Sequence, residues 1–186
     1  MKRVIKQTDN KFLNMYEARV PLRSGGDRPY FFASRAKDAS ELKMNGGKKT
    51  DGVDIVAYYG DRIVLVKQYR VPIDGYVYEC PAGLIDEGEE AQDAAVRELF
   101  EETGLTLHPE SAPEGGYRGF YTSVGMSDEA CAVVYGQATG EVSTKGLEDS
   151  ENLTVVLADK KEAERILACE PLSLRCALAL REFIKG

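Results

Sequence analysis

The sequence is poor in the nitrogen and sulfur side chains that bind transition metals. It contains one histidine, His108, and four cysteines without Cys-x-x-Cys spacing, which are Cys80, Cys131, Cys169 and Cys176. A single histidine cannot form a zinc site without closely spaced cysteines. We therefore expect four free thiols, as is usual in a reducing compartment. His108 precedes a proline and is expected on a surface loop.

Long apolar runs and basic clusters are also missing. The first twenty residues contain no apolar core of a signal peptide, and no segment approaches the length of a membrane span. The net charge is −7, and no run of Lys and Arg is long enough to follow a nucleic-acid backbone. These absences predict a cytoplasmic protein with neither a membrane nor a nucleic-acid polymer as its partner.

The 186 residues suit one α/β domain with a small N-terminal extension. We place the extension at residues 1–48 and the main domain at residues 49–186. Alternating or β-branched runs predict strands, and apolar periodicity predicts helices. The expected strands are 12–20, 28–34, 53–59, 62–68, 76–80, 117–121, 130–137 and 152–157, and the expected helices are 89–103, 160–169 and 172–184. This mixture predicts an α/β/α sandwich with a mixed sheet, plus a β-rich extension.

One acidic segment dominates what is present. Residues 86–102 contain eight carboxylates and one basic residue, Arg97. Carboxylates close together on a helix repel one another. A divalent cation bound by hard oxygen ligands, magnesium or else manganese, would neutralise them.

The spacing of this segment predicts a helix with two faces. Glu98, Glu101 and Glu102 fall within about a third of the circumference and form an acidic face that we expect to be exposed. Val96, Leu99 and Phe100 form a separate face that we expect to pack on the core, while the alanines before Glu98 share its side. The alternative is a solvated acidic helix with no site. It predicts bases spaced to pair with the acids, which Arg97 alone cannot provide.

The same stretch fills every fixed position of the Nudix box, G-x5-E-x7-R-E-U-x-E-E-x-G-U, where U is aliphatic. It starts at Gly83, continues through Glu89 and ends with the run from Arg97 to Leu105. The segments 79–83 (ECPAG) and 66–70 (VKQYR) resemble the ADP-ribose pyrophosphatase-like branch of this family. The chain therefore resembles a Nudix hydrolase of that branch.

The resemblance implies a role for each box residue. Glu98 and Glu102 would carry the metal, and the carbonyl of Ala82 would add a ligand. The remaining box positions would be structural: Gly83 gives the loop its freedom, Arg97 pairs with Glu89, and Gly104 ends the helix.

The resemblance also implies the residues outside the metal site. The general base would be Glu129, on the loop after the box, with Glu101 as the second candidate. Asp128 and Glu129 could instead form only a polar turn. Arg70, Glu79 and Arg35 are expected to bind the substrate.

The implied activity is a magnesium-dependent cleavage of ADP-ribose or a related ADP-sugar to AMP and a sugar phosphate, by a homodimer that forms through the extension. Alternatives are hydrolysis of GDP-mannose, another nucleotide sugar or a dinucleotide. Val124 stands where the branch commonly has proline, which leaves the sugar and base open. A non-catalytic nucleotide-sensing module is a further alternative, although such modules often lose box glutamates that this chain keeps.

Overall fold

The computed structural model describes residues 3–42, 50–147 and 152–186. The chain forms two compact units. The first combines Met1–Asp51 with Arg118–Cys131, and the second combines Gly52–Tyr117 with Ala132–Gly186. The boundary that we predicted between residues 48 and 49 lies outside the described residues.

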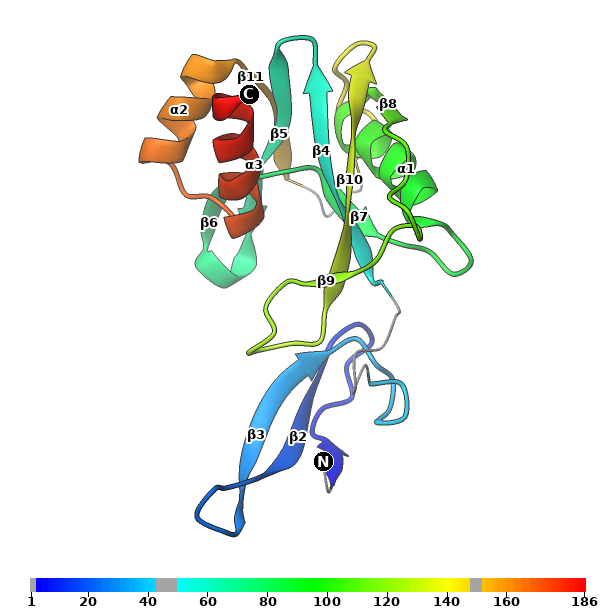
Figure 1. The fold of residues 1–186 in the computed structure, drawn as a ribbon, viewed down its shortest axis with the longest axis vertical. Coiled ribbons are helices and arrows are strands. Elements are labelled where there is room, and N and C mark those ends of the chain that lie inside the picture. The colour runs from blue at the N-terminus through cyan, green and yellow to red at the C-terminus, as the bar shows by residue number, and fades with distance from the viewer. Residues whose placement is uncertain (1–2, 43–49, 148–151) are drawn as a thin grey trace. The chain divides into compact units, whose positions relative to one another are not determined.

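The second unit is built on a mixed sheet with the strand order β11-β5-β4-β10-β8. Strands β4 and β10 point the same way in Figure 1, whereas β5 is antiparallel to its neighbours β4, β11 and β6. The short strand β7 pairs with β4, and β9 pairs with the start of β10. The bounds are β4 Gly52–Tyr59, β5 Arg62–Arg70, β6 Gly75–Glu79, β7 Ala82–Leu84, β8 Thr106–Pro109, β9 Phe120–Tyr121, β10 Ala130–Thr139 and β11 Leu153–Ala158.

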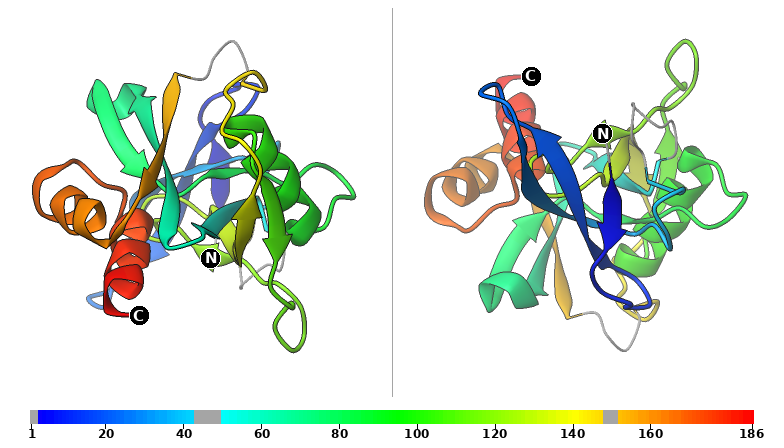
Figure 2. Two further views of the ribbon diagram at one scale, coloured as in Figure 1. Left: turned by 90° about the horizontal axis from the view of Figure 1, so that it is seen from above. Right: turned by 90° about the horizontal axis from the view of Figure 1, so that it is seen from below.

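Helices cover both faces of this sheet (Figures 1 and 2). Helix α1 (Ala91–Thr103) lies on one face, and α2 (Lys160–Cys169) and α3 (Leu174–Lys185) lie on the other. Successive strand residues point to opposite faces, so Ile55 packs in the core beneath α1 while Val56 packs beneath α2 and α3. The predicted α/β/α sandwich is confirmed. Among the described residues, no helix combines the length and apolar character needed to cross a bilayer.

The first unit contains a three-stranded antiparallel sheet, β1-β2-β3, as the predicted β-rich extension requires. Its strands are β1 Val4–Lys6, β2 Asn14–Pro21 and β3 Asp27–Ser34. Gly25 and Gly26 both have positive φ in the turn between β2 and β3, where an L side chain would be strained. Tyr16 is fully buried in this unit and stacks on Phe32, with the ring centroids 5.7 Å apart.

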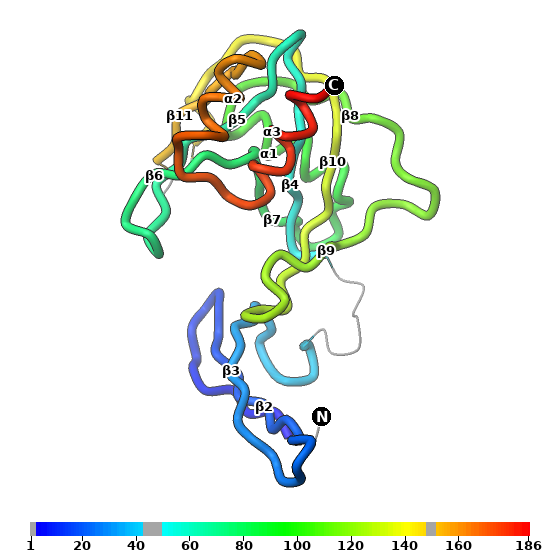
Figure 3. The backbone as a smooth tube through the Cα atoms, turned by 60° about the vertical axis from the view of Figure 1, so that its left-hand side comes forward, coloured from blue at the N-terminus to red at the C-terminus, as the bar shows by residue number. Residues whose placement is uncertain are grey.

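Several sequence-based predictions need correction. The strand expected at 117–121 is limited to Phe120–Tyr121, and residues 110–117 belong to a projecting loop (Figure 3). His108 lies on strand β8 rather than in a loop, exposed and hydrogen-bonded to Thr139. Strands β1, β7 and β8 were not predicted because three or four residues give too little alternation to detect.

The four cysteines are free thiols, as expected. Cys80 and Cys176, the latter on α3 itself, are both buried in the core between the sheet and helices α2 and α3. A hydrogen bond with Cys176 and burial raise the pKa of the Cys80 thiol well above its usual value. Cys80 is therefore an unreactive core residue.

Candidate active site

The box begins where β7 brings the chain against α1. Strand β7 pairs with β4, so that Asp54 lies opposite Ala82 and Val53 opposite Gly83. A Cβ atom added to Gly83 would overlap the carboxylate of Glu98 on α1. Glycine is needed at position 83 because the Glu98 carboxylate lies directly against its Cα.

Glu102 lies beside the same strand. Its side chain is 3% exposed, and its Oε2 accepts a hydrogen bond from the Ala82 amide at 3.3 Å. The prediction that Glu102 is exposed is therefore wrong. The reason is that β7 and its neighbours cover this side of the helix, a contact that the helical spacing could not reveal.

The predicted packing face of α1 also needs correction. Phe100 is 57% exposed, and Val96 is only partly buried. Leu99 is fully buried as predicted, together with Ala94 and Ala95, which we had assigned to the acidic side. The core-facing stripe is therefore rotated toward the glutamates. Helix α1 ends at Thr103, and Gly104 follows in the left-handed conformation with φ 74°.

Arg97 connects the box glutamates. Its Nε and Nη2 donate to both carboxylate oxygens of Glu89, at 2.9 and 2.8 Å. Its Nη1 donates to Glu98 Oε1 at 2.8 Å and to Glu101 Oε2 at 3.0 Å, and Nη2 also donates to the carbonyl of Leu84. These hydrogen bonds lower the pKa of Glu89 and raise that of Arg97. One guanidinium thus holds the loop before α1 against three acids of the box.

The donor atoms at this place suit a hard divalent cation. Glu98 supplies carboxylate oxygens beside Gly83 and Glu102 supplies them beside Ala82, and the Ala82 carbonyl belongs to the same strand. Within the described ranges, no three His, Cys, Asp or Glu side chains are grouped closely enough to hold a metal as they stand. Glu98 and Glu101 are paired with Arg97 instead. The glycine cradle and the donor type fit a metal, and Glu98 would have to exchange Arg97 for it.

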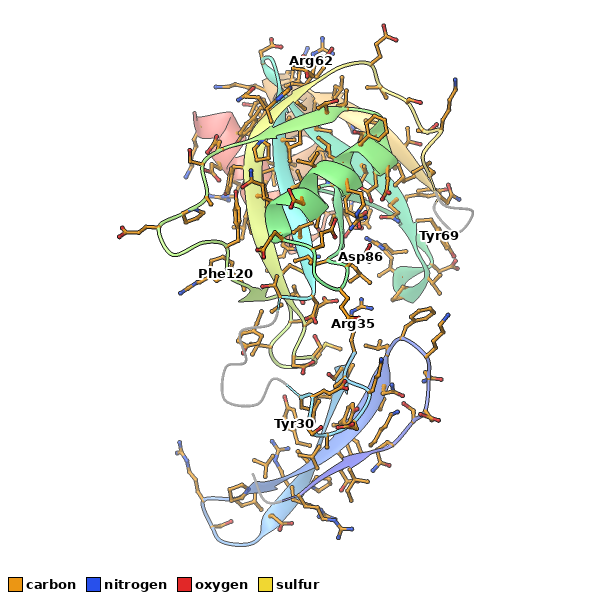
Figure 4. The ribbon with its side chains drawn as sticks, turned by 90° about the vertical axis from the view of Figure 1, so that its right-hand side faces the viewer. Tyr30, Arg35, Arg62, Tyr69, Asp86 and Phe120 are labelled. Carbon is orange, nitrogen blue, oxygen red and sulfur yellow. The ribbon has the colours of Figure 1, made fainter. Side chains whose placement is uncertain are left out.

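Two predicted substrate-binding residues contact each other on the hairpin of β5 and β6. Arg70 Nε donates to Glu79 Oε2 at 2.6 Å, and Glu79 is the more buried of the two. Tyr69, labelled in Figure 4, lies on the same hairpin. Glu79 therefore orients the guanidinium of Arg70, whose planar fork suits a phosphate.

The third predicted substrate-binding residue, Arg35, and the candidate base, Glu129, belong to the first unit. Arg35, directly after β3, forms an ion pair with Glu129, with Nη2 and Oε1 3.2 Å apart. Thr122 Oγ1 donates to Glu129 Oε2 at 2.8 Å. The candidate base is thus held by a basic residue that we had assigned to the substrate.

Sequence reasoning overlooked one charged residue near the box. Asp54 is buried in β4, opposite Ala82, and its Oδ1 lies 3.0 Å from Arg175 Nε at the start of α3. The signal was the carboxylate of Asp54 within the otherwise apolar run 53–59. A charge in such a run indicates a buried ion pair or a functional position.

Comparison with known proteins gives consistent results. The NUDIX domain family model matches residues 48–169. An ADP-ribose pyrophosphatase of Bacillus subtilis (strain 168) is 34% identical over 96 residues, covering 52% of this chain and 50% of that protein. An ADP-ribose pyrophosphatase of Saccharomyces cerevisiae is 37% identical over 109 residues, covering 56% of this chain and 45% of that protein. The chain thus spans about half the length of these two relatives.

A solved structure shares the fold. The crystal structure of an ADP compounds hydrolase superposes with a TM-score of 0.72, at 20% sequence identity, and the match covers 100% of this chain and 93% of that one.

Proposed function

The chain belongs to the NUDIX domain family, and from that premise we propose that it is a pyrophosphatase that cleaves ADP-ribose or a related ADP-sugar to AMP and a sugar phosphate. Two relatives that carry the name ADP-ribose pyrophosphatase support this choice of substrate. The observation that carries the proposal is the close approach of Glu98 to Gly83, beside the contact between Glu102 and Ala82.

We propose Mg²⁺ as the cofactor, with Mn²⁺ as a substitute, because NUDIX hydrolases generally use divalent metals. Glu98, Glu102 and the carbonyl of Ala82 would hold it. The bound ion would screen the charge of the pyrophosphate and lower the pKa of a water molecule. Arg97 keeps the loop in place through Glu89, so it acts structurally.

Substrate binding and proton transfer are carried out by side chains of the protein. Arg70, oriented by Glu79, binds a phosphate of the substrate. Arg35, which the resemblance also assigns to the substrate, is paired with Glu129. As water attacks phosphorus and the P–O bond of the anhydride breaks, Glu129 accepts the proton of the water. Glu101 is the second candidate for this role, although Arg97 holds its carboxylate.

We also propose that the extension mediates homodimerisation. Ile5 and Phe31 are exposed on one face of the β1-β2-β3 sheet, in register through Glu17, and Met15 lies on the same face. Sedimentation velocity would test this. Wild type should sediment as a dimer, and Phe31→Asp should shift it toward the monomer. A monomeric wild type would exclude the dimer.

The activity is tested by a substrate panel. ADP-ribose, ADP-glucose, GDP-mannose, NADH and diadenosine polyphosphates are each incubated with Mg²⁺, with Mn²⁺ or with EDTA, and AMP and phosphosugar release are measured. Selective, metal-dependent turnover of ADP-ribose is the expected result. Glu98→Gln, prepared in parallel, controls for contaminating hydrolases. Folded wild-type protein that turns over none of these compounds would contradict the proposal.

A further inference from the structure

The segment of residues 122–129 is attached to strand β3, which lies about ninety residues earlier in the chain. The hydroxyl of Tyr30 donates to the carbonyl of Gly125 at 2.6 Å. The amide of Ala33 donates to the carbonyl of Met126 at 2.8 Å. Ala33 also forms a parallel β-bridge with Ser127, the residue after Met126. The middle of the segment is therefore fixed to β3 by both side-chain and backbone hydrogen bonds.

The end of the segment is fixed to the same strand by charge. Arg35 follows β3 directly, and its Nη2 lies 3.2 Å from Glu129 Oε1. Tyr30 and Arg35 are both labelled in Figure 4. The second oxygen of the Glu129 carboxylate accepts a hydrogen bond from Thr122 Oγ1 at 2.8 Å. Both carboxylate oxygens thus have defined partners.

The segment is also closed on itself. The Thr122 amide donates to the Glu129 carbonyl at 3.0 Å, and the Met126 and Ser127 amides donate to the Ser123 carbonyl at 2.8 and 2.9 Å. Because its two ends are joined, a displacement of the middle is transmitted to Glu129. A hydrogen bond at Gly125 can therefore control the position of a carboxylate four residues away.

We propose that strand β3 positions the catalytic base, with Tyr30 and Arg35 as positioning residues that act through Glu129. The inference rests on the proposed function, in which Glu129 accepts the proton of the attacking water. A general base works only when it is held within hydrogen-bond reach of that proton. Tyr30 and Arg35 of the N-terminal extension would thereby influence turnover through Glu129, independently of any role in dimerisation.

Tyr30→Phe tests the proposal, because it removes one hydroxyl and leaves the ring in place. We expect kcat to fall roughly tenfold to a hundredfold, which is the cost of a misplaced catalytic group, with little change in KM. Tyr59→Phe is the matched control. Tyr59 makes the same kind of bond, from its hydroxyl to the carbonyl of Gly140 at 3.0 Å, in the other unit. Its kcat should equal that of wild type.

A double-mutant cycle separates positioning from substrate binding. If Tyr30 and Arg35 act through Glu129, Tyr30→Phe and Arg35→Ala should lower kcat no further in a Glu129→Gln background. Arg35→Lys should restore part of the kcat lost in Arg35→Ala. If Arg35 contacts only the substrate, its removal raises KM, and its effect adds to that of Glu129→Gln. Additive effects for both residues would overturn the proposal.

Hydrogen exchange followed by mass spectrometry provides a readout without turnover. Tyr30→Phe should speed amide exchange at Ala33 and across residues 122–129, whereas Tyr59→Phe should not. Unchanged exchange in Tyr30→Phe overturns the attachment, even if the wild-type enzyme hydrolyses none of the tested substrates. A different result separates this inference from the proposed function. If wild type is active, Glu129→Gln is inactive and Tyr30→Phe is fully active, this inference is overturned and the proposed function stands. Full activity in Glu129→Gln would overturn both the base assignment and the positioning.

Discussion

Replacing Gly83 by alanine is the sharpest test of the metal site, because it moves one carboxylate without removing it. A Cβ atom at this position would overlap all three heavy atoms of the Glu98 carboxyl group. The backbone of Gly83 does not have positive φ, so alanine can adopt its conformation. The flexible end of Glu98 must therefore swing away while the backbone stays in place.

The energetic consequence for folding is small. The displaced carboxylate loses its hydrogen bond from Arg97, and a hydrogen bond to a charged group is worth about 1.5–3 kcal/mol. Arg97 retains Glu89 and Glu101, and the loss of glycine from the unfolded chain returns about 0.4–1 kcal/mol. A net loss of about 1–2 kcal/mol would lower Tm by only about 2–8 °C in a domain of this size.

The consequence for metal binding is large. Disturbing even an outer residue of a metal site costs about tenfold to a hundredfold in affinity or activity, so displacing a ligand should cost at least a hundredfold in kcat. Mn²⁺ binding measured by electron paramagnetic resonance should weaken in parallel. Gly75→Ala is the control, since its new Cβ would lie 3.6 Å from the Ile73 carbonyl oxygen, an ordinary contact. Wild-type turnover and Mn²⁺ affinity in Gly83→Ala would refute the assignment of Glu98 as a ligand.

Three further outcomes are expected. Glu102→Gln should lower kcat by orders of magnitude. In urea unfolding, Glu102→Ala should cost about 1–3 kcal/mol, whereas Glu101→Ala, at a partly exposed ion pair, should cost about 0.5 kcal/mol or less. In steady-state kinetics, Arg70→Ala should raise KM far more than it lowers kcat; the reverse would remove Arg70 from substrate binding. Burial and Glu182 raise the pKa of Tyr135 to about 12, so the stability that this group contributes is present below pH 10 and is lost as pH rises toward 12. The pKa values of four other tyrosines, Tyr16, Tyr58, Tyr69 and Tyr117, are raised too, so the late phase of the phenolate absorbance titration should lose the amplitude of one tyrosine in Tyr135→Phe.

The sequence predicted what is encoded locally. The strands around the turn at Gly60, the helix after the box glycine and its end at Gly104 follow from β-branched runs, helical spacing and turn residues. The helical spacing placed Glu98, Glu101 and Glu102 on one side of α1. It could not distinguish the buried Glu102 from the partly exposed Glu101, because β7 covers only part of that side.

Contacts between distant segments could not be predicted. Arg35 and Glu129 are 94 residues apart, and each is an ordinary polar residue of a turn or strand end in the sequence. The pair of Asp54 and Arg175 likewise joins a central strand to the last helix. The carboxylate of Asp54 within an apolar run indicated a buried ion pair, but it did not identify Arg175 as the partner.

Strand β10 is divided between the two units, and this division limits which recombinant forms of the chain keep the first unit intact. Its first two residues belong to the first unit and the rest to the second, so the first unit is encoded by two separate stretches of the gene. A crossover near residue 51 would exchange the N-terminal sheet and leave behind residues 118–131, which are attached to it by hydrogen bonds. A hybrid protein would have to inherit both stretches from one parent. Substitutions in β3 and in the segment 122–129 should therefore be inherited together.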